Sequence, residues 1–279
     1  MNSQIPGPVL DVQDLVTEYP GRGWRARPFR VLHGVSLTVA PGETMGLVGE
    51  SGSGKTTMGR AVLGLAPVTG GRILFEGDDI SAASRRERRL LSRRMQVVFQ
   101  DPYTSLNPAM NIEEILTEPL LVQGESKSDA RRRITELLDR VHLPADSRTR
   151  LAREFSGGQR QRVAIARALA LQPRLIVCDE PVSALDLSTQ ARILDLFLEL
   201  QEASEVAYLF ISHDLDVVRH VSHRVAVMYH GNIVEYGEAE QVTTAPTDPY
   251  TRKLLLASPV ANPVEQRQRR AERIRLTTS

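Results

Sequence analysis

A glycine-rich loop between an apolar run and a helical pattern constrains this sequence more than any other feature. The apolar run covers Thr44–Val48, and the loop Val48–Thr57 reads V-G-E-S-G-S-G-K-T-T. The residues after it place apolar side chains on one face of a predicted helix, at Met58, Ala61, Val62 and Leu65. Strand, loop and helix in this order form the setting in which the pattern G-x-x-x-x-G-K-[ST] binds phosphate. The stretch therefore predicts a nucleoside triphosphate site.

The residue types of this loop suit an anion. Glycines let backbone N–H groups turn inward, and the following helix adds the positive end of its dipole. Lys55 can reach the β- and γ-phosphates, and the Thr56 hydroxyl is placed to bind Mg²⁺. An ordinary glycine-rich turn is the alternative, and the strand–loop–helix setting argues against it. We expect the phosphate contacts to come from Gly49, Glu50, Ser51, Gly52, Ser53, Gly54, Lys55, Thr56 and Thr57.

The composition excludes several other classes of protein. The chain has 279 residues, of which 41% are apolar and 25% charged, with a net charge of +1, so no global field attracts nucleic acid or an anionic membrane. The single cysteine, Cys178, excludes an internal disulfide and a Cys₄ metal or iron–sulfur site. No apolar run approaches the roughly 18 residues of a membrane span, and no signal peptide pattern opens the chain. We therefore expect a cytoplasmic protein that does not cross a membrane by itself.

Strand and helix patterns alternate along much of the chain and predict an α/β core. The early strand candidates are Val9–Val16, Val31–Val39 and Arg72–Phe75. Alternation from about residue 158 to residue 235 implies a mainly parallel sheet covered on both faces. We expect these strands to surround the nucleotide site.

Residues from Tyr103 to about Phe155 differ from this core because their apolar residues recur at helical spacing. One helical pattern begins near Ile112 and is expected to end at Pro119, since proline breaks helices. A second follows Ser128-Asp129, which can act as a cap. We predict a helical subdomain inserted into the α/β core.

Two adjacent carboxylates end an apolar strand candidate, Leu175–Cys178. A buried strand that ends in aspartate is where phosphate-loop enzymes hold Mg²⁺, so Asp179 is the expected metal-side carboxylate. Glu180, one residue later, can reach a water aligned on the γ-phosphate and accept its proton. An exposed acidic strand end is the alternative, but it would account for only one of the two carboxylates.

Two further features point to the same ligand. His213 closes another apolar strand and is a candidate γ-phosphate contact, although an isolated histidine is more often structural. Ser156, Gly157, Gly158 and Gln159 open a predicted helix and form a second anion-binding amino terminus. One ATP needs one phosphate loop, so this second loop suggests a second surface for the same ligand.

The motifs over residues 9–245, and their order along the chain, resemble those of the nucleotide-binding subunits of ABC transporters. The resemblance implies a P-loop NTPase (RecA-like) core with an antiparallel β subdomain and the inserted helical subdomain. The matching motifs are the Walker A loop at Gly49–Thr56, the Q-loop at Gln100, the signature motif at Ser156–Gln159, the Walker B strand at Leu175–Asp179, the catalytic glutamate Glu180, the D-loop at Ser183–Asp186 and the switch histidine His213.

The resemblance also implies how these residues act. Two subunits form a head-to-tail dimer that encloses two ATP molecules, each between the Walker A loop of one subunit and the signature loop of the other. The implied catalytic residues are Lys55, Gln100, Glu180 and His213; the implied Mg²⁺ ligands are Thr56, Gln100 and Asp179; and Ser156, Gly157, Gly158, Gln159 and Asp186 complete the nucleotide site.

The sequence leaves more than one candidate for the residue that stacks on adenine. Tyr19 lies where the family usually has this aromatic residue, but the long segment up to Arg30 makes Trp24 or Phe29 an alternative.

Three stretches resemble importers of the oligopeptide, dipeptide and nickel group. They are Phe99–Pro108, Phe155–Arg162 and Ala245–Leu255, the last of which contains the motif D-P-Y-T-R. Many members of the group carry an iron–sulfur cysteine cluster after this point, which the single cysteine of this chain excludes. We predict an ATP-binding domain over residues 1–245, with the helical insert at about 103–155, and an importer-like segment with a basic tail over residues 246–279.

This resemblance implies peripheral attachment at the cytoplasmic face of the inner membrane. The expected partners are transmembrane permease subunits, a second ATPase subunit, identical or different, and indirectly an extracytoplasmic solute-binding protein, with no nucleic acid. A soluble ABC ATPase acting on ribosomes or nucleic acid is the alternative, and an exporter cassette is a third. Neither two cassettes nor a nucleic-acid-reading insert occurs in the sequence.

Overall fold

The computed structural model describes residues 7–21, 23 and 27–257. These residues form two compact units. One unit contains residues 7–10, 39–43 and 82–209, and the other contains residues 11–38, 44–81 and 210–257. The phosphate loop and His213 belong to the second of these units, while Gln100, the signature motif and the two adjacent carboxylates belong to the first.

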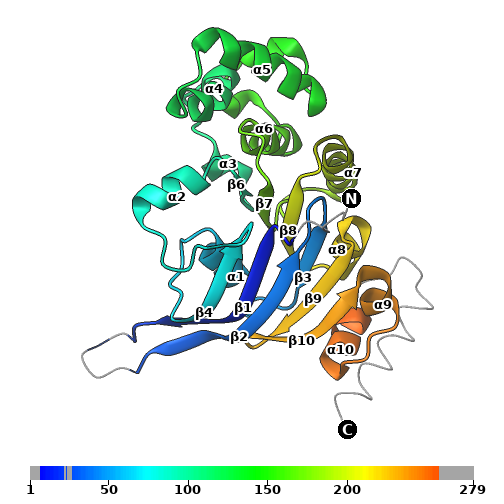
Figure 1. The fold of residues 1–279 in the computed structure, drawn as a ribbon. Coiled ribbons are helices and arrows are strands. Elements are labelled where there is room, and N and C mark those ends of the chain that lie inside the picture. Colours follow the sequence, from blue (N-terminus) through cyan, green and yellow to red (C-terminus); the bar gives the residue numbers. More distant parts are fainter. Residues whose placement is uncertain (1–6, 22, 24–26, 258–279) are drawn as a thin grey trace, which may run out of the picture. The chain divides into compact units, whose positions relative to one another are not determined.

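The unit with the phosphate loop holds most of the strands. Its elements, drawn in Figure 1, are β1 (Leu10–Tyr19), β2 (Phe29–Val39), β3 (Thr44–Val48), α1 (Lys55–Val62), β4 (Gly70–Phe75), β5 (Asp78–Asp79), α8 (Leu215–Val221), β9 (Arg224–Tyr229), β10 (Asn232–Glu238), α9 (Ala239–Thr244) and α10 (Pro249–Ala257).

Two sets of strands organise this unit. One sheet has the order β2-β1-β4-β5, with β4 and β5 antiparallel. In the other, β3 runs parallel to β9 with Val48 opposite Val227, and β10 pairs antiparallel with β9. All five residues of β3 are buried, which explains why this strand is mostly apolar. Figure 1 shows α9 and α10 beside β10, which both helices contact.

The other unit holds most of the helices. Its elements are α2 (Arg85–Leu91), β6 (Met95–Val98), α3 (Pro102–Ser105), α4 (Ile112–Val122), α5 (Lys127–Arg140), the 3₁₀ helices η1 (Ala145–Thr149) and η2 (Ala152–Glu154), α6 (Gly157–Leu169), β7 (Leu175–Asp179), α7 (Leu187–Ser204) and the first half of β8 (Ala207–Ser212). β6 and β7 are parallel neighbours, with Val98 opposite Cys178. Cys178 is fully buried, and this burial raises the pKa of its thiol, so it packs as a protonated small hydrophobe.

Two helix boundaries were predicted wrongly. Ser128-Asp129, expected to cap the second helix, lies inside α5, which begins at Lys127 with Ser126 as its N-cap; the Asp129 N–H donates to the Ser126 Oγ at 3.1 Å.

The helix expected to end at Pro119 continues as α4 to Val122. A capping box of Asn111 and Glu114 starts the helix firmly, and its apolar face, which includes Leu120, is buried. Proline removes one backbone donor from the helix, and here the packing on both sides of it outweighs that loss.

No helix among the described residues combines the length and apolar character needed to span a bilayer.

Candidate functional site

The phosphate loop is shaped by a glycine that no other residue could replace without movement. Gly49 directly follows β3 and has a φ of 155°, in the region that favours glycine. A Cβ atom at this position would lie 2.2 Å from the backbone oxygen of Met228 in β9. β9 and the loop therefore approach each other too closely for any side chain at residue 49.

The Lys55 side chain lies against the loop that precedes it. Its Nζ donates to the carbonyl oxygens of Gly49, at 2.6 Å, and of Glu50, at 2.9 Å. The residue is only 4% exposed although it carries a charge. A buried ammonium needs acceptors around it, and the curled backbone of the loop supplies them. The structure thus places the lysine of the motif inside its own loop.

The rest of the loop is held by backbone hydrogen bonds. The Ser53 N–H donates to the Glu50 carbonyl at 3.2 Å, and the Gly231 N–H, in the turn after β9, donates to the Ser53 carbonyl at 2.9 Å. Gly54 then caps α1 and accepts from the Met58 N–H at 2.9 Å. The hydroxyl of Ser53 is buried without a hydrogen-bond partner among the described residues. Such a group suits a ligand oxygen in the loop.

These contacts lead to a prediction about stability. Gly49→Ala should lower the free energy of unfolding by several kcal/mol, since overpacking costs about 1–3 kcal/mol and left-handed backbone strain a further 1–2 kcal/mol or so. The matched control is Gly52→Ala, where φ is 82° but nothing lies within 4 Å of the added Cβ, so only the strain remains. Thermal unfolding should show a clearly larger drop in Tm for Gly49→Ala. Equal drops in Tm would contradict the close approach to Met228.

His213 lies at the carboxyl end of β8, as predicted, and its side chain is exposed. Two fixed groups flank it. The Asp214 N–H donates to the Ser212 Oγ at 3.0 Å, and the Asp214 carboxylate caps α8 by accepting from the Asp216 N–H at 2.8 Å. These hydrogen bonds define the backbone on both sides of the histidine.

In the other unit, Glu180 has an unusual backbone. It follows β7 with a φ of 51°, which is uncommon for a residue with a side chain and often marks a functional turn. Its carbonyl oxygen accepts from the Ser183 N–H at 3.3 Å and from the Ser183 Oγ at 3.1 Å. The tight turn swings the chain away from β7 directly after Asp179. Both carboxylates are half-buried at the strand end, as predicted.

The parallel register brings Gln100 to the same edge. Because Val98 of β6 pairs with Cys178 of β7, Gln100 and Glu180 both lie two residues beyond a matched pair. Carboxyl ends of parallel strands meet at one edge of a sheet. The structure therefore places Gln100 and Glu180 at the same edge of the sheet, within one unit.

The signature residues begin α6. Ser156 is its N-cap, with a capping box in which the Gln159 N–H donates to the Ser156 Oγ at 3.4 Å and the Ser156 N–H donates to the Gln159 Oε1 at 3.0 Å. A Cβ at Gly158 would lie 2.4 Å from a methyl carbon of Thr189 in α7. Ser156 itself is exposed, so the amino terminus of a 13-residue helix faces outward.

Asp186 of the predicted D-loop is the N-cap of α7. Its carboxylate accepts from the Ser188 Oγ at 2.7 Å and from the Thr189 N–H at 3.0 Å. These hydrogen bonds lower the pKa of Asp186 well below its usual value, so the carboxylate stays ionised. Since Thr189 also lies against Gly158, the D-loop helix and the signature loop contact each other directly.

Three aromatic residues are the predicted alternatives for the adenine contact. Tyr19 is half-buried at the end of β1, and Phe29 is 68% exposed at the start of β2. Trp24 lies outside the described residues.

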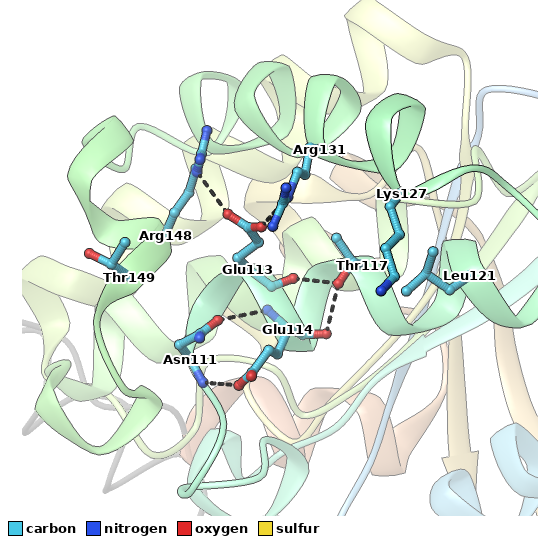
Figure 2. Close-up of a pocket in the computed structure, with 9 residues that line it drawn as sticks. All are labelled: Asn111, Glu113, Glu114, Thr117, Leu121, Lys127, Arg131, Arg148 and Thr149. Carbon is cyan, nitrogen blue, oxygen red and sulfur yellow. Dashed lines mark hydrogen bonds and ion pairs between the residues drawn. The ribbon is translucent and has the colours of Figure 1, made fainter.

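A hollow that the sequence did not predict lies between α4, α5 and η1, with a volume of about 470 Å³ (Figure 2). Figure 2 shows Glu113 between two arginines: its carboxylate pairs with the Arg131 Nε at 2.6 Å and with the Arg148 Nε at 3.2 Å. One carboxylate thus joins three elements, and none of the residues predicted to bind ATP lines the hollow. We interpret it as an ion-pair cluster that holds the helices together.

Sequence reasoning also missed Tyr250. Its hydroxyl accepts from the Glu50 N–H of the phosphate loop at 3.0 Å, although 200 residues separate the two. The sequence signal at Tyr250 was its place in the motif D-P-Y-T-R, but this motif does not indicate a contact with the phosphate loop.

Comparison with known proteins identifies the family. The family model described as ABC transporter matches residues 32–183. Glutathione import ATP-binding protein GsiA of Escherichia coli (strain K12) is 52% identical over 268 residues, which cover 94% of this chain and 43% of that protein. The chain thus spans less than half the length of this relative. A putative peptide import ATP-binding protein of Brucella ovis is 49% identical over 263 residues, which cover 94% of this chain and 82% of that protein.

Solved structures agree with this. The cbiO1 structure from Clostridium perfringens, part of the ABC transporter complex cbiONQ, has a TM-score of 0.77 at 26% identity and covers 85% of this chain and 91% of that one. A dimeric ATP-binding cassette in a post-hydrolysis state with ADP and Pi, MJ0796, has a TM-score of 0.73 at 27% identity, with 82% and 98% covered. The predicted P-loop cassette fold is confirmed, and the chain belongs to the ABC transporter family of ATP-binding cassettes.

Proposed function

We propose that this chain binds and hydrolyses ATP to energise an importer of peptides or related small solutes. The observation that carries the proposal is the enclosed Lys55 ammonium, held by the carbonyls of Gly49 and Glu50 at the amino terminus of α1. The importer class is supported by relatives whose names contain glutathione import and peptide import, at 52% and 49% identity.

The phosphate loop fits the phosphates of ATP. Gly49 and Gly54 keep its backbone bare, and the buried Ser53 hydroxyl has no hydrogen-bond partner among the described residues. Lys55 supplies positive charge where the β- and γ-phosphates would lie. The remaining loop residues Glu50, Ser51, Gly52, Thr56 and Thr57 complete this half of the site.

Mg²⁺ would be held jointly by the protein and the substrate. No cluster of three or more His, Cys, Asp or Glu side chains suited to a metal occurs in the described part of the chain. This agrees with Mg²⁺ chemistry, since the ion is usually bound by one or two carboxylates together with phosphate oxygens and water. Thr56, Gln100 and Asp179 are the residues we assign to it. When bound, the ion neutralises charge that develops on the phosphate oxygens.

Hydrolysis of ATP then depends on how the catalytic side chains are positioned around the γ-phosphate and the attacking water. Glu180, fixed by its tight turn, accepts the proton of the attacking water, and His213 holds the γ-phosphate. Lys55 stabilises the negative charge that grows during the reaction, and Gln100 aligns the water and the metal. The products are ADP and inorganic phosphate, and the proton of the water leaves through Glu180.

A dimer would give the second anion-binding loop its role. Ser156, Gly157, Gly158 and Gln159 start α6 on an exposed surface, where they can reach the γ-phosphate of ATP bound to a neighbouring subunit. Asp186 supports this loop through Thr189. We propose a head-to-tail pair of ATPase subunits, with ATP-driven closure as the power stroke.

The partners follow from this role. They are transmembrane permease subunits, a second ATPase subunit and, indirectly, an extracytoplasmic solute-binding protein, with the chain attached peripherally to the cytoplasmic face of the inner membrane. Peptides, nickel chelates and related solutes remain the candidate cargoes.

Co-purification separates this proposal from an ATPase that acts on ribosomes or nucleic acid. A tagged chain, extracted from its own cells in mild detergent, should bring down polytopic membrane proteins together with any sister ATPase. Washing with nuclease and high salt should not change this recovery. Ribosomes or DNA in place of membrane subunits would refute the importer proposal.

A further inference from the structure

The segment after β10 folds back tightly at the start of α10. The Asp248 carboxylate caps this helix by accepting from the Tyr250 N–H at 2.8 Å and from the Thr251 N–H at 3.4 Å. Pro249 occupies the first helical position, Thr251 is completely buried, and the Arg252 Nε donates back to the Pro246 carbonyl at 2.9 Å. Asp248, Pro249 and Arg252 therefore each help to hold this turn, whereas the Tyr250 side chain makes its contacts with residues outside it.

A buried carboxylate on β10 anchors the same segment. Glu235, only 8% exposed, accepts from the Thr247 N–H at 2.6 Å, the Thr247 Oγ1 at 2.9 Å and the Asp248 N–H at 3.2 Å. Burial alone would raise the pKa of Glu235, but its hydrogen bonds outweigh this and lower it. An ionised acceptor with three donors fixes where α10 begins, and therefore where Tyr250 lies.

Tyr250 connects this anchored segment to the phosphate loop. Its ring lies 4.1 Å from the ring of Tyr229, at the end of β9, and packs against the buried cluster around Val48. Its hydroxyl accepts from the Glu50 N–H at 3.0 Å. Burial raises the pKa of Tyr250, so the hydroxyl stays neutral.

The hydrogen bond from the Glu50 N–H to Tyr250 restrains one peptide group of the phosphate loop. The Gly49 carbonyl and the Glu50 N–H belong to one planar peptide unit. Lys55 donates to the carbonyl at 2.6 Å, and Tyr250 accepts from the N–H at 3.0 Å. This peptide is therefore fixed at both ends, and rotating it would break both hydrogen bonds. Because Gly49 is a glycine, its own backbone would otherwise allow such rotation.

We propose that Tyr250 is a positioning residue for ATP, which holds the Gly49–Glu50 peptide so that the phosphate loop is preformed before nucleotide binds. The segment 246–257 then belongs to the nucleotide site and does not serve only as a cover for β10. This inference rests on the proposed ATP-binding function.

The test removes one atom. Tyr250→Phe keeps the ring on Tyr229 and deletes only the hydroxyl, so the fold should persist. Losing one neutral hydrogen bond should weaken ATP binding about two- to tenfold and raise KM for ATP by the same factor, with kcat nearly unchanged. Amide hydrogen exchange at Glu50 should become faster in the nucleotide-free protein. Tyr236→Phe is the matched control, since its hydroxyl on β10 accepts from Arg224 instead of from the phosphate loop.

The outcomes distinguish the two proposals. If the wild-type protein fails to bind ATP in a calorimetric titration, the proposed function is wrong. If it binds ATP but Tyr250→Phe binds equally well, the role of Tyr250 is wrong. A lower kcat at unchanged KM, or an equal loss of affinity in Tyr236→Phe, would mean that the hydroxyl supports only the fold, and would also overturn it.

A second variant checks that the anchor acts through Tyr250. Glu235→Gln removes the charge that holds Thr247 and Asp248 while keeping the shape of the side chain. Its effect on ATP affinity should be smaller when Tyr250→Phe is already present than when it is introduced alone, because the two changes disturb the same contact. Fully additive effects would overturn the connection between β10 and the loop.

Discussion

Glu180→Gln should lower the rate of ATP hydrolysis by about 100-fold to 10,000-fold, the range that general-base catalysis contributes, while ATP binding stays intact. Glutamine has nearly the same shape, so the turn at Glu180, with its φ of 51° and its bonds from Ser183, should persist. It cannot accept a proton at neutral pH, so the attacking water is no longer activated. The rate is measured as phosphate release at saturating ATP.

The same variant should stabilise the closed dimer. ATP that cannot be cleaved keeps favouring the closed state, so light scattering with ATP should show a larger dimeric fraction than in the wild type. The matched control is Glu202→Gln, an exposed glutamate on α7 in the same unit, which should leave both measurements unchanged. Normal turnover by Glu180→Gln would remove Glu180 as the base.

The parts of the fold that could be predicted are those where local pattern and burial agree. β3 reads as an apolar run because all its residues are buried, and β7 ends at Asp179 as its sequence indicates. The glycines of the phosphate loop and the lysine that follows them are almost sufficient to predict phosphate binding. Few other sequences leave the backbone before a helix free of bulky side chains.

Where the prediction failed, distant residues decide the structure. The helix expected to end at Pro119 continues because its buried face packs on both sides of the proline. Glu235 and Tyr250 look like surface residues in the sequence, yet one anchors α10 and the other touches Glu50. Local patterns carry no information about which residues 200 positions apart meet.

Ser156→Arg should lower hydrolysis by about 100-fold to 1,000-fold, the loss found when one group that stabilises transition-state charge is removed. ATP binding by the isolated monomer should stay close to that of the wild type. The physical reason is space: the exposed serine leaves the amino terminus of α6 open to a neighbouring ATP, and a guanidinium would fill that gap. Hydrolysis and nucleotide affinity are measured separately on the same preparation.

The substitution also removes a helix cap, so it needs a control with the same defect. Ser84→Arg provides one: Ser84 caps α2 with a capping box, and its φ of −64° and ψ of 165° equal those of Ser156. Both variants should lose about 0.5–2 kcal/mol of stability from the cap, but only Ser156→Arg should lose hydrolysis. Equal losses of activity would assign the effect to the cap. Loss of ATP binding by the Ser156→Arg monomer would refute action across the dimer.

Mixing two inactive variants tests the shared site directly. Lys55→Ala removes the charge at the phosphate loop, and Ser156→Arg blocks the signature loop. In a head-to-tail pair of this chain, one site of the mixed dimer combines both defects, while the other combines the intact phosphate loop of one subunit with the intact signature loop of its partner. Part of the activity should therefore return on mixing. If Lys55 and Ser156 instead served one ATP within a single subunit, every site in the mixture would carry a defect and no activity could return.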